Sequence, residues 1–267
     1  MGRWLPVIGL LVLAYAAICA FVFFRQRQML YFPAHVSEAV LASEARAVGL
    51  SRWLNAEGQP IGWTAAGDAS IPPILICHGN AGHAVDRIDI VRRLRAAGIG
   101  AAFFILDYPG FGSRAGTLSE ESLSAAAVEA LRSLPSPAIV FGESLGAGVA
   151  AQAASHAPER VRGLILLTPF DSVVGAAAHH YPWLPVRFLV LDRFDSIRAL
   201  RDFRAPIAVI IAEKDDTTPP EGGQRLFNSL TGPKKLWLVP GAGHNGTLDG
   251  LSDAQWLDIW QFLNSQQ

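Results

Sequence analysis

Apolar residues in this 267-residue chain gather in short unbroken runs, with little of the alternation that marks a sheet with one solvated face. Such runs are typical of strands covered on both faces, as in a mainly parallel sheet with helices on each side. We predict eight strands, at residues 48–54, 59–64, 74–76, 101–106, 138–141, 161–167, 207–212 and 235–239. Helices are predicted at residues 83–97, 119–134, 147–157 and 251–263, the second with Ser119 as its N-cap. The alternation of strands and helices predicts an α/β fold.

The N-terminus has a different pattern, since residues 4–24 carry no charged side chain. At about 1.5 Å per residue, a helix of this length spans roughly 30 Å, the thickness of the hydrocarbon core of a bilayer. We therefore predict a membrane anchor at residues 1–25, a linker at residues 26–48 and one further domain at residues 49–267.

The alternative to an anchor is a signal peptide, because Ala14-Tyr15-Ala16 resembles a cleavage site. Cleavage there would leave the apolar residues 18–24 exposed on the mature protein, which favours an uncleaved anchor. Arg3 and the α-amine before the apolar segment balance Arg25 and Arg27 after it. The charges therefore leave the side of the membrane open.

Composition supports a membrane segment and excludes one class of partner. The chain is 51% hydrophobic and only 17% charged, which is rather apolar for a soluble domain. Its net charge of −1 provides no basic field, so we expect no binding to nucleic acid. The two cysteines, Cys19 and Cys77, fall in the predicted anchor and next to a predicted buried strand, so no disulfide framework is expected.

The segment Gly142-Glu143-Ser144-Leu145-Gly146 has the pattern of a nucleophile elbow. A predicted strand precedes it and a predicted helix follows it, so Ser144 lies on a strand-to-helix turn. The backbone must bend so sharply there that glycine is needed two residues before and two residues after the serine. The N-terminal N–H groups of the helix then favour the negative charge that develops when an ester carbonyl is attacked.

A second loop, at residues 77–83, follows the predicted strand at residues 74–76 and opens a helix. Ligands of an open α/β sheet lie at the carboxyl ends of its strands, so this loop and the elbow should face the same cleft. The backbone N–H groups of Asn80 and Leu145 are our candidates for an oxyanion hole. The alternative is a glycine-rich turn that only caps the helix.

A catalytic serine needs a base, and the base needs an acid that orients it. His244 lies in a loop just beyond the last predicted strand and has the position that the chain order Ser, Asp, His requires. Asp215 and Asp216 follow the strand at residues 207–212. Adjacent residues point in different directions, so one of the two should orient His244, and the residues alone do not separate them.

Four segments in this order resemble the α/β-hydrolase superfamily, and the resemblance covers roughly residues 49–263. They are His78-Gly79-Asn80-Ala81-Gly82, Asp107-Tyr108-Pro109-Gly110-Phe111-Gly112, Gly142-Glu143-Ser144-Leu145-Gly146 and Gly243-His244-Asn245. Together they are similar to a membrane-anchored group that includes eukaryotic hydrolase-domain proteins, some of which remove palmitate from protein cysteines. The resemblance implies the α/β-hydrolase fold, with a mostly parallel eight-stranded sheet, helices on both faces and a small cap.

The resemblance also assigns roles to single residues. It selects Asp215 as the acid, because the acid of that group stands four residues before a proline and Pro219 has this place here. The group usually has an aliphatic residue before that proline, where this chain has Thr218. Asp107 is implied to be structural, and Tyr108 to shape the floor of the site.

The predicted cap lies at about residues 170–205, after the strand at residues 161–167. Four apolar residues of this segment either line a pocket for an acyl chain or belong to the core: Trp183, Leu184, Phe188 and Leu189. The predicted function is a serine hydrolase of small-molecule or lipid-like esters or thioesters, a monomer held at a membrane, with no metal or organic cofactor. The alternatives are a serine peptidase on the same fold and a membrane-tethered binding protein without catalysis.

Overall fold

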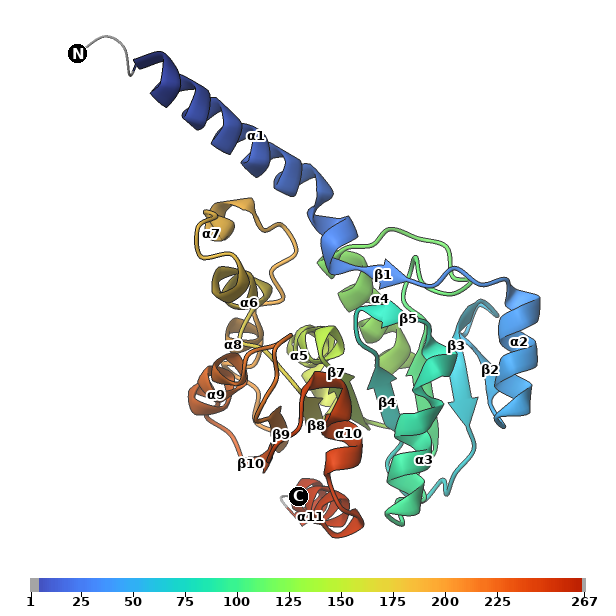
Figure 1. The fold of residues 1–267 in the computed structure, drawn as a ribbon. Helices are drawn as coiled ribbons and strands as arrows, with labels where there is room; N and C mark the ends of the chain where they lie inside the picture. Colours follow the sequence, from blue (N-terminus) through green and yellow to red (C-terminus); the bar gives the residue numbers. More distant parts are fainter. Residues whose placement is uncertain (1–4, 266–267) are drawn as a thin grey trace.

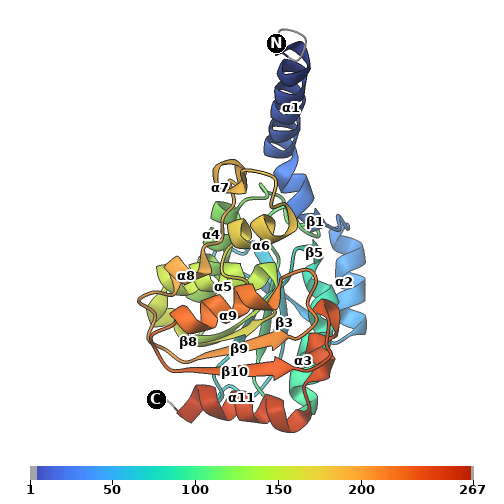
Figure 2. The same cartoon turned by 60° about the vertical axis from the view of Figure 1, so that its left-hand side comes forward.

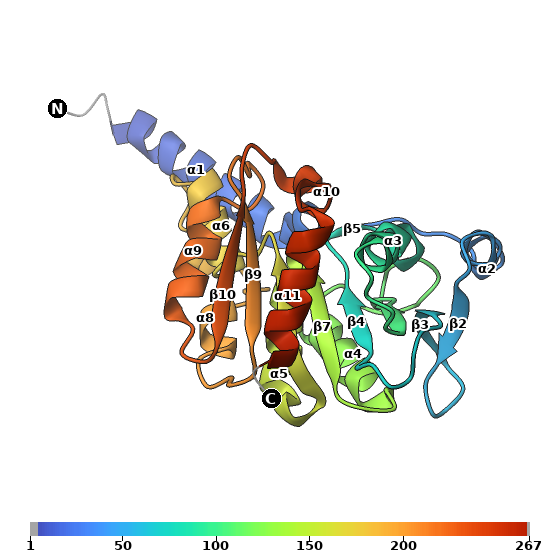
Figure 3. The same cartoon turned by 90° about the horizontal axis from the view of Figure 1, so that it is seen from below.

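The centre of the structure, a computed structural model that describes residues 5–265, is a twisted sheet. Within these residues the sheet has eight strands in the order β10-β9-β8-β7-β4-β6-β3-β2 (Figure 3). Its strands are β2 (Ser51–Leu54), β3 (Pro60–Ala65), β4 (Ile74–Cys77), β6 (Phe103–Leu106), β7 (Ala138–Glu143), β8 (Val161–Leu167), β9 (Ile207–Ala212) and β10 (Lys234–Val239). Neighbouring strands pair in parallel throughout β6, β4, β7, β8, β9 and β10, whereas β3 runs antiparallel to both β2 and β6. The predicted α/β-hydrolase fold class is thus confirmed.

Helices cover both faces of the sheet, because successive side chains of each central strand point to opposite sides. The main helices are α2 (Glu38–Ala47), α3 (Ile88–Ala96), α4 (Glu120–Ser133), α5 (Leu145–His156), α9 (Pro220–Ser229) and α11 (Asp253–Ser265). Leu75 and Val140 join one apolar core with α4, α5 and α9, whereas Ile76 and Phe141 join the other core with α3 and α11. Shorter helical turns are η1 (Ala84–Arg87), η2 (Pro158–Arg160), η3 (His244–Gly246) and α10 (Thr247–Gly250).

The segment between β8 and β9 forms three short helices, α6 (Val173–His180), α7 (Val186–Leu189) and α8 (Ser196–Ala199). In Figure 1 α6 and α7 lie above the body of the molecule, on the side from which the N-terminal helix α1 (Leu5–Leu30) emerges. This arrangement agrees with a small cap. The predicted N-cap of α4 is also present, since the Ser119 side chain accepts a hydrogen bond from the backbone N–H of Ser122 at 3.1 Å.

Helix α1 (Leu5–Leu30) projects from the body of the molecule (Figures 1 and 2). Within residues 5–265 it is the one helix long and apolar enough to cross a membrane, a test that a signal sequence also passes. The first four residues of the predicted anchor lie outside the described residues. The helix ends at Leu30, shortly before Pro33, whose ring disfavours helical backbone in the residue before it.

The segment predicted as a linker carries side chains that pack into the body. Tyr31 is 2% exposed, and Leu41 and Ala45 of α2 are fully buried. In addition, β1 (Phe32–Pro33) pairs in parallel with β5 (Ala81–Gly82), a short two-stranded sheet that the sequence pattern does not predict. The polypeptide between α1 and the main sheet is therefore held against the body along its length.

Asp107, at the end of β6, is fully buried and pairs with the guanidinium of Arg52 from β2. The Arg52 side chain also lies over the Trp63 ring at 4.3 Å. Burial raises the pKa of the Asp107 carboxyl above its ordinary value, although the hydrogen bond and charge of Arg52 oppose this. The pair joins two strands at one end of the sheet, which agrees with a structural role for Asp107.

Replacing Arg52 by methionine would leave the buried Asp107 carboxylate without its counter-charge, at a cost of about 3–5 kcal/mol near pH 8. The pKa of Asp107 would rise further in the variant. Its folded state would then bind a proton that the unfolded state releases, so part of the lost stability returns as the pH falls towards about 5. Denaturant unfolding in detergent micelles, followed by tryptophan fluorescence at both pH values, measures this.

The matched control is Arg92→Met, because the Arg92 ion pair with Asp89 is exposed. This control should change the free energy of unfolding by less than about 1 kcal/mol at either pH. A loss of stability in Arg52→Met that is the same at both pH values would contradict the assignment.

Candidate active site

Ser144 lies on a sharp turn between β7 and α5, as predicted. Its φ of 53° and ψ of −116° are unusual for a residue other than glycine, and such backbone strain is common at functional sites. The turn is held on both sides, because the Ser144 N–H donates to the Leu167 carbonyl at 2.9 Å and the Ala147 N–H donates to the Ser144 carbonyl at 2.9 Å.

The flanking glycines allow backbone to touch backbone at this turn. A Cβ atom added to Gly142 would lie 2.5 Å from the carbonyl oxygen of Gly146, and one added to Gly146 would lie 2.0 Å from that of Cys77. Both separations are shorter than any tolerable contact. The prediction that these two positions cannot carry a side chain is confirmed by the geometry.

Three polar side chains from separate loops meet at the carboxyl edge of the sheet. The Nε2 atom of His244 lies 3.0 Å from the hydroxyl oxygen of Ser144. The Nδ1 atom of His244 lies 2.9 and 2.8 Å from the two carboxylate oxygens of Asp215. Ser144 follows β7, Asp215 follows β9 and His244 follows β10, so the parallel strands bring all three together.

The structure distinguishes the two neighbouring aspartates. Asp215 is 6% exposed and contacts the imidazole, whereas Asp216 is exposed and bonds weakly to Thr217. Burial raises the pKa of the Asp215 carboxyl, but the hydrogen bond and charge of His244 and two backbone N–H donors outweigh this and lower it below its ordinary value. The lowered pKa favours the ionised form of Asp215 beside the imidazole.

Thr218 is a further polar residue of this cluster that the sequence reasoning treated only as a departure from the usual aliphatic residue. Its hydroxyl lies 2.9 Å from Asp215 Oδ2, 3.0 Å from the Thr168 carbonyl oxygen and 3.2 Å from His244 Nδ1. Since one hydroxyl donates one hydrogen, it serves either the carboxylate or the carbonyl. The signal available in the sequence was the polar Thr218 itself, at a position where the resembled group usually has an aliphatic residue.

The loop with Asn80 passes directly beside the serine. A Cβ atom on Gly79 would lie 3.8 Å from the Ser144 Cβ. Leu145, the other candidate oxyanion donor, is the first residue of α5 and is buried. In the described residues, neither the Asn80 N–H nor the Leu145 N–H donates to a turn, loop or cap carbonyl.

The same loop is bonded to the segment that leaves α1. The Asn80 side-chain amide donates to the Leu30 carbonyl at 2.9 Å, and the Asn80 carbonyl accepts from the Phe32 N–H at 2.8 Å. Farther along, the Ala34 N–H donates to the Gly82 carbonyl at 2.9 Å. The end of α1 and the segment that follows it, both within the predicted linker, therefore contact the loop that carries a candidate oxyanion donor.

At the start of the same loop, His78 is fully buried against aromatic rings. Its ring centroid lies 4.2 Å from that of Tyr108 and 5.1 Å from that of Phe111. Burial lowers the pKa of His78 to about 3, and the positive charge of Arg87 adds to this effect. The imidazole is therefore neutral, and the Tyr108 hydroxyl, which donates to the His78 carbonyl at 3.0 Å, supports the floor of the site.

The cap residues are divided between two environments. Leu184 is buried, but Trp183 and Phe188 are 56% and 75% exposed. Trp183 and Phe188 are therefore not core residues, and with more than half of each residue exposed they do not line an enclosed acyl pocket either.

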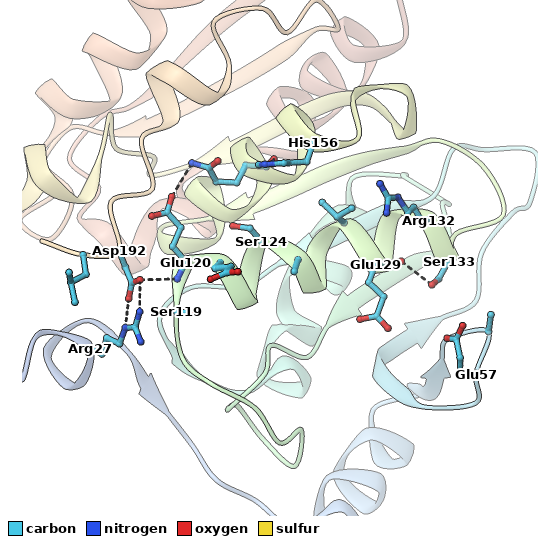
Figure 4. Close-up of a pocket in the computed structure, with 16 residues that line it drawn as sticks. Arg27, Glu57, Ser119, Glu120, Ser124, Glu129, Arg132, Ser133, His156 and Asp192 are labelled. Carbon is cyan, nitrogen blue, oxygen red and sulfur yellow. Dashed lines mark hydrogen bonds and ion pairs between the residues drawn. The ribbon is translucent and has the colours of Figure 1, made fainter.

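A groove of about 1050 Å³ runs along α4 and is lined by none of Ser144, Asp215 and His244 (Figure 4). Figure 4 shows Arg27, Asp192 and Glu120 at one end of this groove, with Glu129, Arg132 and Ser133 farther along α4. The groove is therefore separate from the Ser144 cluster. Within residues 5–265 no group of three histidine, cysteine or acidic residues is arranged to hold a metal ion.

Comparisons with known proteins support the same fold. Residues 72–193 match the family described as the alpha/beta hydrolase fold. The chain is 35% identical over 265 residues to the uncharacterized protein MT2364 of Mycobacterium tuberculosis, covering 93% of this chain and 91% of that protein. It is 30% identical over 200 residues to lysophosphatidylserine lipase ABHD12 of Rattus norvegicus, covering 66% of this chain and 50% of that protein.

Among solved structures, the esterase PF2001 of Pyrococcus furiosus superposes with a TM-score of 0.64 at 16% identity, over 88% of this chain and 98% of that one. At this level of identity the likeness shows a shared fold. The relatives and the structures thus agree on the fold around the Ser144 cluster.

Gly146→Ala should destabilise the protein by about 3 kcal/mol or more, because the added methyl group meets strand backbone that cannot move aside. Gly246→Ala is the matched control, since Gly246 has a φ of −92° and nothing lies within 4 Å of the place that an added methyl group would take. We expect the control to change stability by less than about 0.5 kcal/mol. Thermal unfolding in micelles compares them, and equal melting temperatures would contradict the close approach.

Asn80→Ala keeps the backbone N–H of residue 80 but removes the side-chain bond to Leu30. We expect kcat on a short soluble ester to fall about tenfold with little change in KM, because an oxyanion donor acts mainly in the transition state. Asn228→Ala, on the exposed end of α9, is the matched control and should leave both constants unchanged. If Asn80→Ala retained full kcat, the side-chain bond would have no part in positioning the loop.

Proposed function

Because the chain belongs to the alpha/beta hydrolase family, we propose that it is a serine hydrolase that cleaves carboxylic esters or thioesters. The observation that carries the proposal is the continuous hydrogen-bonded chain from Ser144 through His244 to Asp215, with contacts of 2.8–3.0 Å. A lipase among the relatives supports a lipid-like ester as substrate.

In the proposed reaction the Ser144 hydroxyl attacks the substrate carbonyl while His244 Nε2 takes its proton. Asp215 holds the Nδ1–H of the imidazole and stabilises the imidazolium. The N–H groups of Leu145 and Asn80 donate to the oxyanion of the tetrahedral intermediate. His244 then protonates the departing alcohol or thiol, and water attacks the acyl group on Ser144 by the reverse sequence of proton transfers.

We also propose that the enzyme is located at a membrane. Residues 1–25 form the anchor, and the hydrolase domain at residues 49–267 carries its cap at about residues 170–205. The length and apolar character of α1 support this division. Lipid-like acyl substrates gather in bilayers, so an anchor raises their concentration near the Ser144 site.

Two variants of one neighbouring pair test the mechanism. Asp215→Asn should lower kcat on a p-nitrophenyl ester by about 10⁴-fold, because the imidazole loses its anionic partner and its correct tautomer. Asp216→Asn, one residue away and exposed, should keep kcat within about twofold. Equal losses in the two variants would contradict the assigned acid.

Labelling separates catalysis from binding alone. A fluorophosphonate probe should label the folded wild-type protein at Ser144, as read by mass spectrometry of the labelled peptide, and should not label Ser144→Ala. A folded protein that remains unlabelled would instead be the binding protein without catalysis. Rates on aminoacyl anilides that match those on esters would support a peptidase.

A further inference from the structure

Helix α1 is bonded to the cap at two separate levels, near its middle and near its C-terminal end. The Tyr15 hydroxyl donates to the Trp183 carbonyl at 2.8 Å. Farther along, the Gln26 side chain donates to the Leu189 carbonyl at 3.0 Å and accepts from the Leu191 N–H at 2.8 Å. Figures 1 and 2 both show α7 beside α1. The cap and the helix therefore keep one relative position.

The base of this contact is an ionic cluster around the buried Asp192 carboxylate. Asp192 accepts from the Arg27 guanidinium at 2.9 and 3.2 Å, from the Tyr31 hydroxyl at 3.1 Å and from the Glu120 N–H at 3.1 Å. From Tyr15 to Arg27 the helix rises by about 18 Å, at 1.5 Å per residue. Contacts at both levels fix the tilt of α1 against the cap.

The part of the cap nearest to α1, residues 181–191, exposes large apolar side chains, and we call it the cap tip. The exposed fractions are 42% for Tyr181, 56% for Trp183, 75% for Phe188 and 50% for Leu191. Helix α1 also exposes large apolar side chains, among them Leu11, Ile18 and Phe21. An apolar patch of this kind on a protein is typical of a contact with a membrane or another protein.

The position of the cap tip along α1 gives its depth. The charge-free segment of the helix ends at Phe24, immediately before Arg25. If Phe24 marks the edge of the hydrocarbon, Tyr15 lies about 13 Å deeper, nearly the thickness of one leaflet. A tilt of about 40° reduces this depth only to roughly 10 Å. Trp183, which bonds to Tyr15, lies at a similar level.

In the opposite arrangement, with the cap tip in water, the apolar part of α1 that remains is too short to span the bilayer. Between Arg3 and Tyr15 the chain has uncharged residues 4–14, a span of about 16 Å as a helix. The hydrocarbon core is about 30 Å thick, so this stretch would cross only half of it.

The polar groups of this region suit the bilayer as well. A tyrosine hydroxyl in hydrocarbon needs a partner, and the Trp183 carbonyl supplies one to Tyr15. Tryptophan and tyrosine are enriched where proteins meet the membrane interface. Arg187 lies with its guanidinium 4.9 Å from the Phe188 ring, and its long side chain can extend its charge towards the headgroups.

We propose that the cap tip inserts into the leaflet through which α1 enters the membrane, so that a lipid bilayer covers Tyr181, Trp183, Phe188 and Leu191. The proposal rests on the membrane location of α1 given under the proposed function. The cap also touches the acid loop, since the Nε2 atom of His180 lies 3.0 Å from the Thr217 carbonyl oxygen. An inserted cap tip thus brings the loop of Asp215 next to the lipid that holds acylated substrates.

Depth-dependent quenching tests the insertion with the full chain in phosphatidylcholine vesicles. A Cys19→Ser background leaves only Cys77, which is fully buried. Trp183→Cys and Phe188→Cys are each labelled with a fluorophore whose emission is quenched by spin-labelled lipids. Leu11→Cys on α1 is the positive control, and Leu257→Cys on α11, at the opposite end of the molecule in Figure 2, is the negative control.

We expect spin labels on the acyl chains to quench positions 11, 183 and 188 and to leave position 257 unchanged. Quenching at position 11 without quenching at 183 and 188 would overturn the insertion while the anchor stands. No quenching at position 11 would show that α1 is not in the bilayer, and the insertion would fail with it. Protection of position 183 from both lipid spin labels and aqueous iodide would indicate cover by a second protein copy, which also overturns the proposal.

Activity gives a second measurement. Trp183→Ser combined with Phe188→Ser should lower the rate on a long-chain ester embedded in vesicles by at least about fivefold, and should leave the rate on a short soluble ester unchanged. Leu257→Ser should change neither rate. A wild-type protein inactive on both esters would contradict the proposed function and leave the quenching result standing. If the double variant and the wild type hydrolysed the embedded ester at equal rates, the cap tip would have no role in substrate access.

Discussion

The close approach of backbone to backbone at the Ser144 turn is the constraint on which the site depends. Gly146 lies against the carbonyl of Cys77, so α5 meets the end of β4 with no side chain between them. This contact places the N-terminus of α5 and the loop after β4 next to each other, beside Ser144. Since β9 and β10 end at the same edge of the sheet, the loops that carry Asp215 and His244 arrive beside it.

Much of this arrangement can be predicted from the sequence, because strands covered on both faces consist of unbroken apolar runs whose ends can be recognised. The eight predicted strands correspond to the eight of the described sheet, with differences of a few residues at their ends. The candidate residues stand directly after those runs, so their common edge follows from the topology. The choice between Asp215 and Asp216 does not follow in this way, because it depends on donors such as the Thr218 N–H that the folded loop brings into place.

Contacts between distant segments leave no periodic signal, and these are the features that sequence reasoning missed. The pairing of β1 with β5 joins two strands of two residues each, too short for any pattern. The exposure of Trp183 and Phe188 was hidden for a related reason, since an apolar side chain in a short turn has the same sequence appearance inside a core and on a surface. Thr218 departs from the expected residue type, but its three polar contacts become visible only in the fold.

The hydrogen bonds between Asn80 and the exit of α1 have a consequence for how the two parts of the chain can be separated. A membrane helix joined by a loose tether is an independent module, which evolution can exchange and a protease can remove without harm to the enzyme. Here the Leu30 carbonyl and the Phe32 N–H belong to the support of a loop beside Ser144. A proteolytic cut between residues 25 and 34 would therefore alter the released body as well as free it, and a fusion that exchanges the helix must keep the native residues from Leu30 to Ala34.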